Sequence, residues 1–108
     1  MTLTELQARL RLWQGHNFPN RESWEPLMGI GEEIGELMHS HLKEHQGIRL
    51  EENHPMKAKD ALGDILIYAA DYANARGFNL QQILDKTWEE VSQRDWQKHR
   101  EEHNDRNI

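Results

Sequence analysis

The chain has 108 residues with 36% hydrophobic and 30% charged content, no Cys and a formal net charge of −6. We expect one domain over residues 1–108 with a polar tail from about residue 100, and neither disulfides, thiolate metal sites nor a basic surface for a nucleic acid polymer. No signal-peptide pattern or long apolar run occurs, so we also expect a soluble, cytoplasmic protein without a membrane segment, and its small core favours a homodimer or homotetramer.

Two helices are predicted in the first half of the chain. The first runs from Thr2 to about Gln14 and stops before the Gly- and Pro-containing segment 15–20. The second runs from about Ser23, as its N-cap, to His45, and Gly47 is its stop signal. Its core-facing stripe is predicted to consist of Ile30, Ile34, Leu37, Met38, His41 and Leu42.

Three glycines lie inside the second predicted helix, at Gly29, Gly31 and Gly35. Each glycine inside a helix costs about 1 kcal/mol relative to Ala. We interpret them as sites where another helix packs closely. No strand precedes them, so they do not form a dinucleotide-binding loop.

Two further helices are predicted after a polar loop at residues 46–53. The third runs from about His54 to Arg76, with Asn53 as its cap and Gly77 as its stop. The fourth begins with a capping box at Asn79 and keeps the helical period to about His99. No strand pattern is present, so the predicted fold is all-α and four-helix bundle-like.

Carboxylates cluster on the second and third predicted helices. Glu33 and Glu36 stand about 60° apart on one helix, beside Glu32, and Asp60, Asp64 and Asp71 fall within about 40° on the other. A solvated acidic surface is the plain alternative. However, bringing several carboxylates together beside apolar stripes costs free energy unless a cation balances their charge. Hard oxygen ligands suit Mg²⁺ or Mn²⁺. Mg²⁺ in proteins often also binds substrate phosphates. We therefore predict a metal site for a phosphorylated substrate.

Other side chains were weighed for a role at this site. Lys86 and Arg94 could share one flank of the last helix and contact phosphate, or form ordinary pairs along the helix. His41 and His45 have the spacing of zinc ligands, although a core position for His41 is the better interpretation. The aromatic residues that could stack on a base, but are more typical of a core, are Trp13, Phe18, Trp24 and Trp96.

The ordered motifs resemble a known family. Glu32-Glu33-Ile34-Gly35-Glu36 is similar to the Glu-Glu-x-x-Glu signature of the MazG-like all-α nucleoside triphosphate pyrophosphohydrolases, and Leu62 to Tyr68 resembles their second, Asp-containing signature. The turn at Gly77 to Leu80, then Lys86, then Arg94-Asp95-Trp96, also follows the family order. The resemblance covers roughly residues 10 to 98.

This resemblance implies a Mg²⁺-dependent hydrolysis of a nucleoside triphosphate to the monophosphate and pyrophosphate, by an intertwined dimer or tetramer. Carried over by position, Glu33, Glu36 and Asp64 hold the metal, and Glu32 completes the site or orients the attacking water. Lys86 and Arg94 then contact the phosphates.

One position departs from the family pattern. Ala61 stands where the second signature has Glu, and Asp60, one residue earlier, is the candidate replacement ligand. Two alternatives therefore stay open beside nucleotide-pool housekeeping. One is a non-catalytic, degenerate relative that only binds nucleotide, metal or another protein; the other is a phosphoribosyl-ATP pyrophosphohydrolase.

Overall fold

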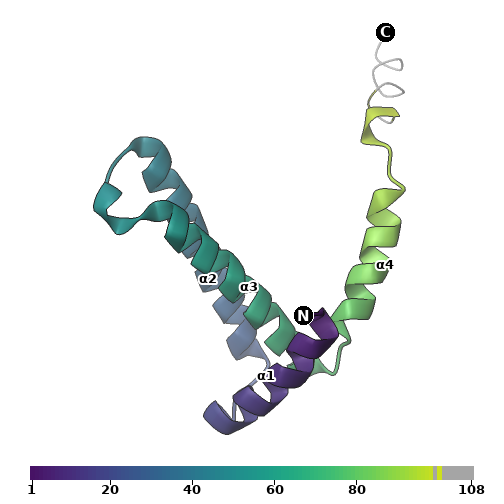
Figure 1. Cartoon of the computed structure of the whole chain (residues 1–108). Helices are drawn as coiled ribbons and strands as arrows, with labels where there is room; N and C mark the ends of the chain where they lie inside the picture. The colour runs from purple at the N-terminus through teal and green to yellow at the C-terminus, as the bar shows by residue number, and fades with distance from the viewer. Residues whose placement is uncertain (99, 101–108) are drawn as a thin grey trace.

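The computed structural model describes residues 1–98 and 100, and within them it contains helices and no strand (Figure 1). The all-α class is therefore confirmed. The elements are α1 (Leu3–Asn17), α2 (Trp24–Gln46), the 3-10 helix η1 (Leu50–Glu52), α3 (His54–Arg76) and α4 (Leu80–Ser92). In this part of the chain, none of the helices combines the length and apolar character needed to cross a bilayer. The predicted polar tail falls at residues 101–108, outside the described residues.

Local signals explain most helix ends. Thr2 and Glu5 form a capping box at the start of α1, and Asn53 accepts a hydrogen bond from the Met56 N–H at the start of α3. Gly47 and Gly77 end α2 and α3, both with φ of 69°, a left-handed conformation that glycine adopts without steric cost. Other boundaries differ from the prediction: α1 continues through its glycine to Asn17, and Ser23 makes no side-chain capping hydrogen bond.

Helices α2 and α3 form a hairpin and pack along each other, and α1 lies across the open end of that hairpin (Figure 1). Small residues bring the two long helices together, since Ala61, Ala70 and Ala73 are buried. A Cβ atom on Gly29 would lie 2.5 Å from the Tyr68 ring, so close packing at this glycine is confirmed. Closely packed small residues therefore fix the α2–α3 contact.

The predicted core-facing stripe of α2 is wrong for four of its six members, while Ile30 and Leu37 are half-buried. Ile34, Met38 and Leu42 are exposed, and so is His41. The buried residues of α2 are instead Pro26, Gly29, Glu33 and Ser40. Helix α2 carries apolar residues on two faces, and α3 packs against the face whose small side chains permit the closest approach.

Helix α4 is shorter and less covered than predicted. It ends at Ser92 rather than near His99, which lies outside the described residues. No residue of α4 is buried, and its contacts are with α1 at its first turn, so it projects away from the α2–α3 hairpin (Figure 1). The four helices therefore do not close into one bundle within a single chain. The radius of gyration is 18.8 Å, against about 13 Å for a compact domain of 100 residues.

One buried glutamine attaches α4 to the rest of the molecule. The Gln7 side chain donates to the Asn74 Oδ1 and to the Phe78 carbonyl, both at 2.9 Å, and accepts from the Leu80 N–H at 2.8 Å. Asn74 in turn donates to the Gln7 carbonyl at 3.0 Å. Three helices, α1, α3 and α4, therefore meet at one polar side chain.

Candidate metal centre

The acidic motif of α2 forms a compact group. Carboxylate oxygens of Glu32, Glu33 and Glu36 all lie within 4.8 Å of one another, on a helix that holds them at fixed spacing. Within the described residues, this is the one group of three or more potential His, Asp or Glu ligands this close together. The sequence prediction that Glu33 and Glu36 share a site with Glu32 agrees with this geometry.

Glu33 differs from its two neighbours because it is buried. It is 8% exposed, and its Oε2 atom has no hydrogen-bond partner. Burial is the largest cause that raises the pKa of Glu33. A hydrogen bond with Glu36 when Glu33 is protonated raises it further, as do the negative charges of Glu36, Asp64 and Glu32. An ionised carboxylate in this position lacks a compensating positive charge, which is the environment that a bound cation would correct.

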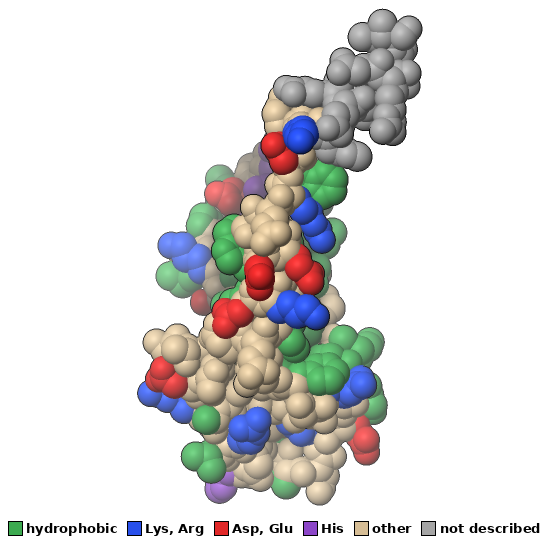
Figure 2. Space-filling view, turned by 90° about the vertical axis from the view of Figure 1, so that its right-hand side faces the viewer, with side chains coloured by type: hydrophobic (Ala, Val, Ile, Leu, Met, Phe, Trp, Pro, Cys, Tyr) green, Lys and Arg blue, Asp and Glu red, His purple; other side chains and the backbone are tan. Residues whose placement is uncertain are grey.

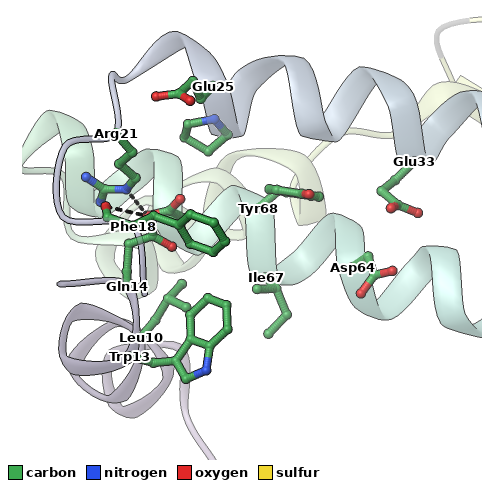
Figure 3. A pocket seen from close by; sticks show the side chains of 12 residues that line it. Leu10, Trp13, Gln14, Phe18, Arg21, Glu25, Glu33, Asp64, Ile67 and Tyr68 are labelled. Atoms are coloured by element: carbon green, nitrogen blue, oxygen red, sulfur yellow. Dashed lines mark hydrogen bonds and ion pairs between the residues drawn. The ribbon is translucent and has the colours of Figure 1, made fainter. Parts of the chain in front are cut away.

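Asp64 approaches the same space from α3. Glu33 and Asp64 line one end of a cavity of about 400 Å³ between α1, α2 and α3, and both carboxylates point toward it (Figure 3). Asp64 is itself exposed and lies outside the tight group of three glutamates. The structure thus brings Glu33 of α2 and Asp64 of α3 to one cavity, while Glu36 and Glu32 do not line it.

The opposite end of this cavity is aromatic and polar. Trp13 and Phe18 stand at its α1 side with ring centroids 5.9 Å apart, near the Gln14 amide (Figure 3). Tyr68 lies between this end and the acidic end. Burial is the largest cause that raises the pKa of Tyr68, followed by the negative charges of nearby carboxylates including Glu32 and Glu33. The cavity is therefore acidic at one end and ring-lined at the other.

The two other aspartates of α3 have separate environments. Asp71 is buried and paired with Arg21, whose Nε lies 2.6 Å from the Asp71 Oδ1. This pairing removes Asp71 from the acidic stripe that the sequence predicted. Asp60 is exposed and lines a different hollow, which it shares with Asp64 of α3 and with Met1 and Leu6 at the start of the chain. The structure does not bring Asp60 into the glutamate group.

Lys86 and Arg94 lie away from the carboxylates of α2. Lys86 is on α4 beside Glu89, Glu90 and Gln93, and Arg94 follows the end of that helix. The α4 face turned toward the viewer in Figure 2 carries acidic side chains beside the basic ones. Because α4 projects away from the hairpin (Figure 1), one chain does not join these cations to the glutamates.

Sequence reasoning missed the role of several residues of the cavity. Gln14 and Arg21 line it but belong to no motif, and Tyr68 lines it although the second signature, to which it belongs, gave it no role. His41 and His45 join no group of three potential ligands in the described part of the chain. The buried histidine is instead His54, whose Nε2 hydrogen-bonds the Ile48 carbonyl at 2.9 Å and ties the loop to α3.

Comparison with known proteins adds no assignment to this geometry. No protein-family model, no curated protein and no solved structure matches the chain.

Proposed function

We propose that the protein hydrolyses a nucleoside triphosphate to the monophosphate and pyrophosphate, with Mg²⁺ or Mn²⁺ as cofactor. The observation that carries this proposal is the buried Glu33 carboxylate within the Glu32–Glu36 group, whose Oε2 has no hydrogen-bond partner and which lies with Asp64 at one end of a cavity. The motif resemblance to MazG-like enzymes supports the same activity. The aromatic end of the cavity supplies ring surfaces suited to a nucleobase.

The residues present fit a divalent cation. Oxygen ligands about 2.1 Å from one Mg²⁺ lie at most about 4.2 Å apart. The oxygens of Glu32, Glu33 and Glu36 lie within 4.8 Å before any adjustment of side chains. The orphaned Glu33 Oε2 supplies a ligand atom that no protein donor occupies. Glu33, Glu36 and Asp64 would hold the cation, and Asp60 lies one helical turn before Asp64 on the same side of α3.

The proposed reaction breaks the bond between the α-phosphorus and the oxygen that bridges to the β-phosphate, and forms a new bond to a water oxygen. When bound, a divalent cation neutralises phosphate charge and lowers the pKa of water. Glu32, the exposed carboxylate of the group, would orient the attacking water and accept its proton. Trp13 and Phe18 would position the base, which restricts the motion of the substrate relative to the carboxylates.

We further propose a cytosolic homodimer or homotetramer that cleans the nucleotide pool. Lys86 and Arg94 keep their proposed role as phosphate contacts. Since α4 holds them away from the carboxylates of its own chain, that role would require another subunit.

Pyrophosphate release from the eight common nucleotides, with and without Mg²⁺ or Mn²⁺, tests the activity, and ³¹P spectra identify the products. We expect release from at least one nucleotide and its loss in Glu36→Ala and Asp64→Ala. Glu44→Ala is the matched control, because it removes an exposed carboxylate near the end of the same helix as Glu36. Mn²⁺ binding measured by electron paramagnetic resonance follows the metal site without any substrate. A full panel without pyrophosphate release would contradict the catalytic proposal.

A second candidate is a degenerate relative that binds metal or nucleotide without hydrolysis. Ala61 favours this second candidate, because the family pattern has Glu at this position. The Ala61 side chain is buried and only 1% exposed. The two candidates separate cleanly, since the degenerate protein binds Mn²⁺ and releases no pyrophosphate. Restored activity in Ala61→Glu would identify the missing carboxylate as the cause. Phosphoribosyl-ATP in the same substrate panel tests the third possibility.

A further inference from the structure

The outer face of α2 carries a continuous apolar stripe that no other helix of the described residues covers. Its members fall within an arc of about 100° around the helix, from its first turns almost to its end. None is charged, and its large side chains are between 42% and 66% exposed. This outer stripe consists of Leu27, Gly31, Ile34, Gly35, Met38 and Leu42, and Trp24 and His45 fall within the same arc at the two ends of the helix.

Two glycines at the centre of the stripe have no explanation within the chain. A Cβ atom added at Gly31 or Gly35 would meet nothing within 4 Å, whereas Gly29 on the inner face packs against Tyr68. A glycine inside a helix lowers helix stability relative to Ala, so an exposed one has a cost without a local benefit. Its benefit appears when another helix crosses closely over it.

We infer that the outer stripe of α2 is the contact surface for a second copy of this chain, with the two α2 helices crossing at Gly31 and Gly35. This contact would be the interface of the homo-oligomer proposed above. It rests on that proposed oligomer but does not depend on the hydrolytic activity. A two-fold contact brings the same patch of each subunit together. An uncharged stripe can meet its own copy without placing like charges opposite each other, although the chain as a whole has a net charge of −6.

The exposed area supplies a large part of what a dimer needs. Leu27, Ile34, Met38 and Leu42 are each about half exposed, and with Trp24 and Met28 on the stripe's border they present on the order of several hundred Å² of apolar surface. A standard interface buries about 800 Å² per partner. The largest apolar patch of an ordinary monomer is about 300–600 Å², so α2 alone approaches the size of an interface.

This contact leaves the candidate metal centre accessible. Glu32 and Glu36 lie outside the arc of the stripe, on the flank of α2 between it and the buried face. Dimer formation and metal binding can therefore be measured separately.

Sedimentation equilibrium and light scattering without nucleotide or metal test the contact. We expect the 108-residue chain to sediment with twice its mass of 12.8 kDa. Met38→Glu should weaken the dimer about 100-fold, as expected for a charge placed at the centre of an interface. His39→Glu adds the same charge one residue away, outside the stripe, and should change the dissociation constant less than about threefold. A monomer mass over the whole concentration series, or equal effects of the two variants, would overturn the inference.

Gly35 allows a test in which helix propensity and dimerisation predict opposite effects of one substitution on stability. Gly35→Leu improves the helix of an isolated chain, yet it should abolish the dimer because the crossing has no room for a side chain. Gly15→Ala in α1, where a Cβ also meets nothing, should leave the dimer intact. Circular dichroism verifies the helical content of each variant. A Gly35→Leu protein that remains dimeric would refute a crossing at this point.

Crosslinking locates the crossing directly, since the chain contains no Cys. Ile34→Cys, next to the proposed crossing, should form an interchain disulfide on mild oxidation. His39→Cys, on another face of α2, should remain largely uncrosslinked under the same conditions. Equal crosslinking of both variants, or crosslinking of His39→Cys alone, would show that α2 meets its partner through a different face.

Discussion

Arg21 and Asp71 form an ion pair of 2.6 Å that joins the segment between α1 and α2 to the C-terminal part of α3. Both side chains are largely buried, with 20% and 7% of their surfaces exposed. The pair lies at the ring-lined end of the cavity (Figure 3). Since fifty residues separate the two partners, it fixes the chain segment that carries Phe18 against the hairpin.

Removing one partner of this pair should be strongly destabilising. Arg21→Met leaves a buried Asp71 charge uncompensated, and we expect the free energy of unfolding to fall by about 3 kcal/mol. Urea denaturation followed by circular dichroism measures this loss. The double variant Arg21→Met with Asp71→Leu should recover most of it, because an apolar pair replaces a broken ion pair. If the double variant is as unstable as the single one, the loss does not come from the unpaired Asp71.

Glu33→Gln should stabilise the metal-free protein at neutral pH. The pKa of Glu33 is raised in the folded state, mainly by burial, so the stability linked to its proton is complete below the unfolded-state pKa and is lost as the pH rises through the folded-state pKa. Gln cannot ionise and avoids that loss. Thermal melts without divalent cations should therefore show a higher melting temperature for Glu33→Gln at pH 7, with a difference that shrinks toward acidic pH. A lower melting temperature for Glu33→Gln throughout this range would contradict the role of burial.

Gln7→Ala should loosen the attachment of α4. It removes two hydrogen bonds that the Gln7 amide donates and leaves the Leu80 N–H without its acceptor, at an expected cost of about 2–4 kcal/mol. Gln81→Ala is the control. Its Oε1 accepts from the Leu3 N–H at 3.2 Å, in a half-buried position, and its loss should cost less than about 1 kcal/mol. Equal destabilisation by both variants would argue against Gln7 as the main attachment.

Two glycine substitutions should act in opposite directions. Gly29→Ala places a Cβ 2.5 Å from the Tyr68 ring, and such overpacking costs about 1–3 kcal/mol. Gly15→Ala meets open space inside α1 and should stabilise the protein by up to about 1 kcal/mol. Differential scanning calorimetry gives both values. A stabilising Gly29→Ala would mean that α2 and α3 can separate at this point at little cost.

The helices themselves could be predicted because their end signals are local. Asn53, Gly47 and Gly77 act through their own backbone and immediate neighbours, and their predicted positions agree with the structure. The end of α4 could not be placed in this way. The apolar period continues past Ser92, and residues 96–98 are again helical, but residues 93–95 interrupt the helix, so periodicity alone overestimated its length.

The face of α2 that meets α3 could not be predicted from periodicity. This helix has apolar residues on two sides, and the wider stripe around Met38 suggested the core. Packing follows the smaller side chains near Gly29 and Ser40, and this choice also buries Glu33. Within the candidate site, the glutamate spacing was therefore predictable, but the burial of Glu33 and the pairing of Asp71 with Arg21 depend on contacts between distant parts of the sequence.

The two ends of the cavity are formed by different parts of the fold, and this has a consequence for the motion of α1. Trp13 and Phe18 come from α1 and the segment after it, whereas Glu33 and Asp64 come from the hairpin. Any molecule long enough to contact both ends of the cavity restrains α1 relative to the α2–α3 hairpin. Amide hydrogen exchange in α1 should then slow when such a molecule is bound, although α1 supplies none of the acidic groups.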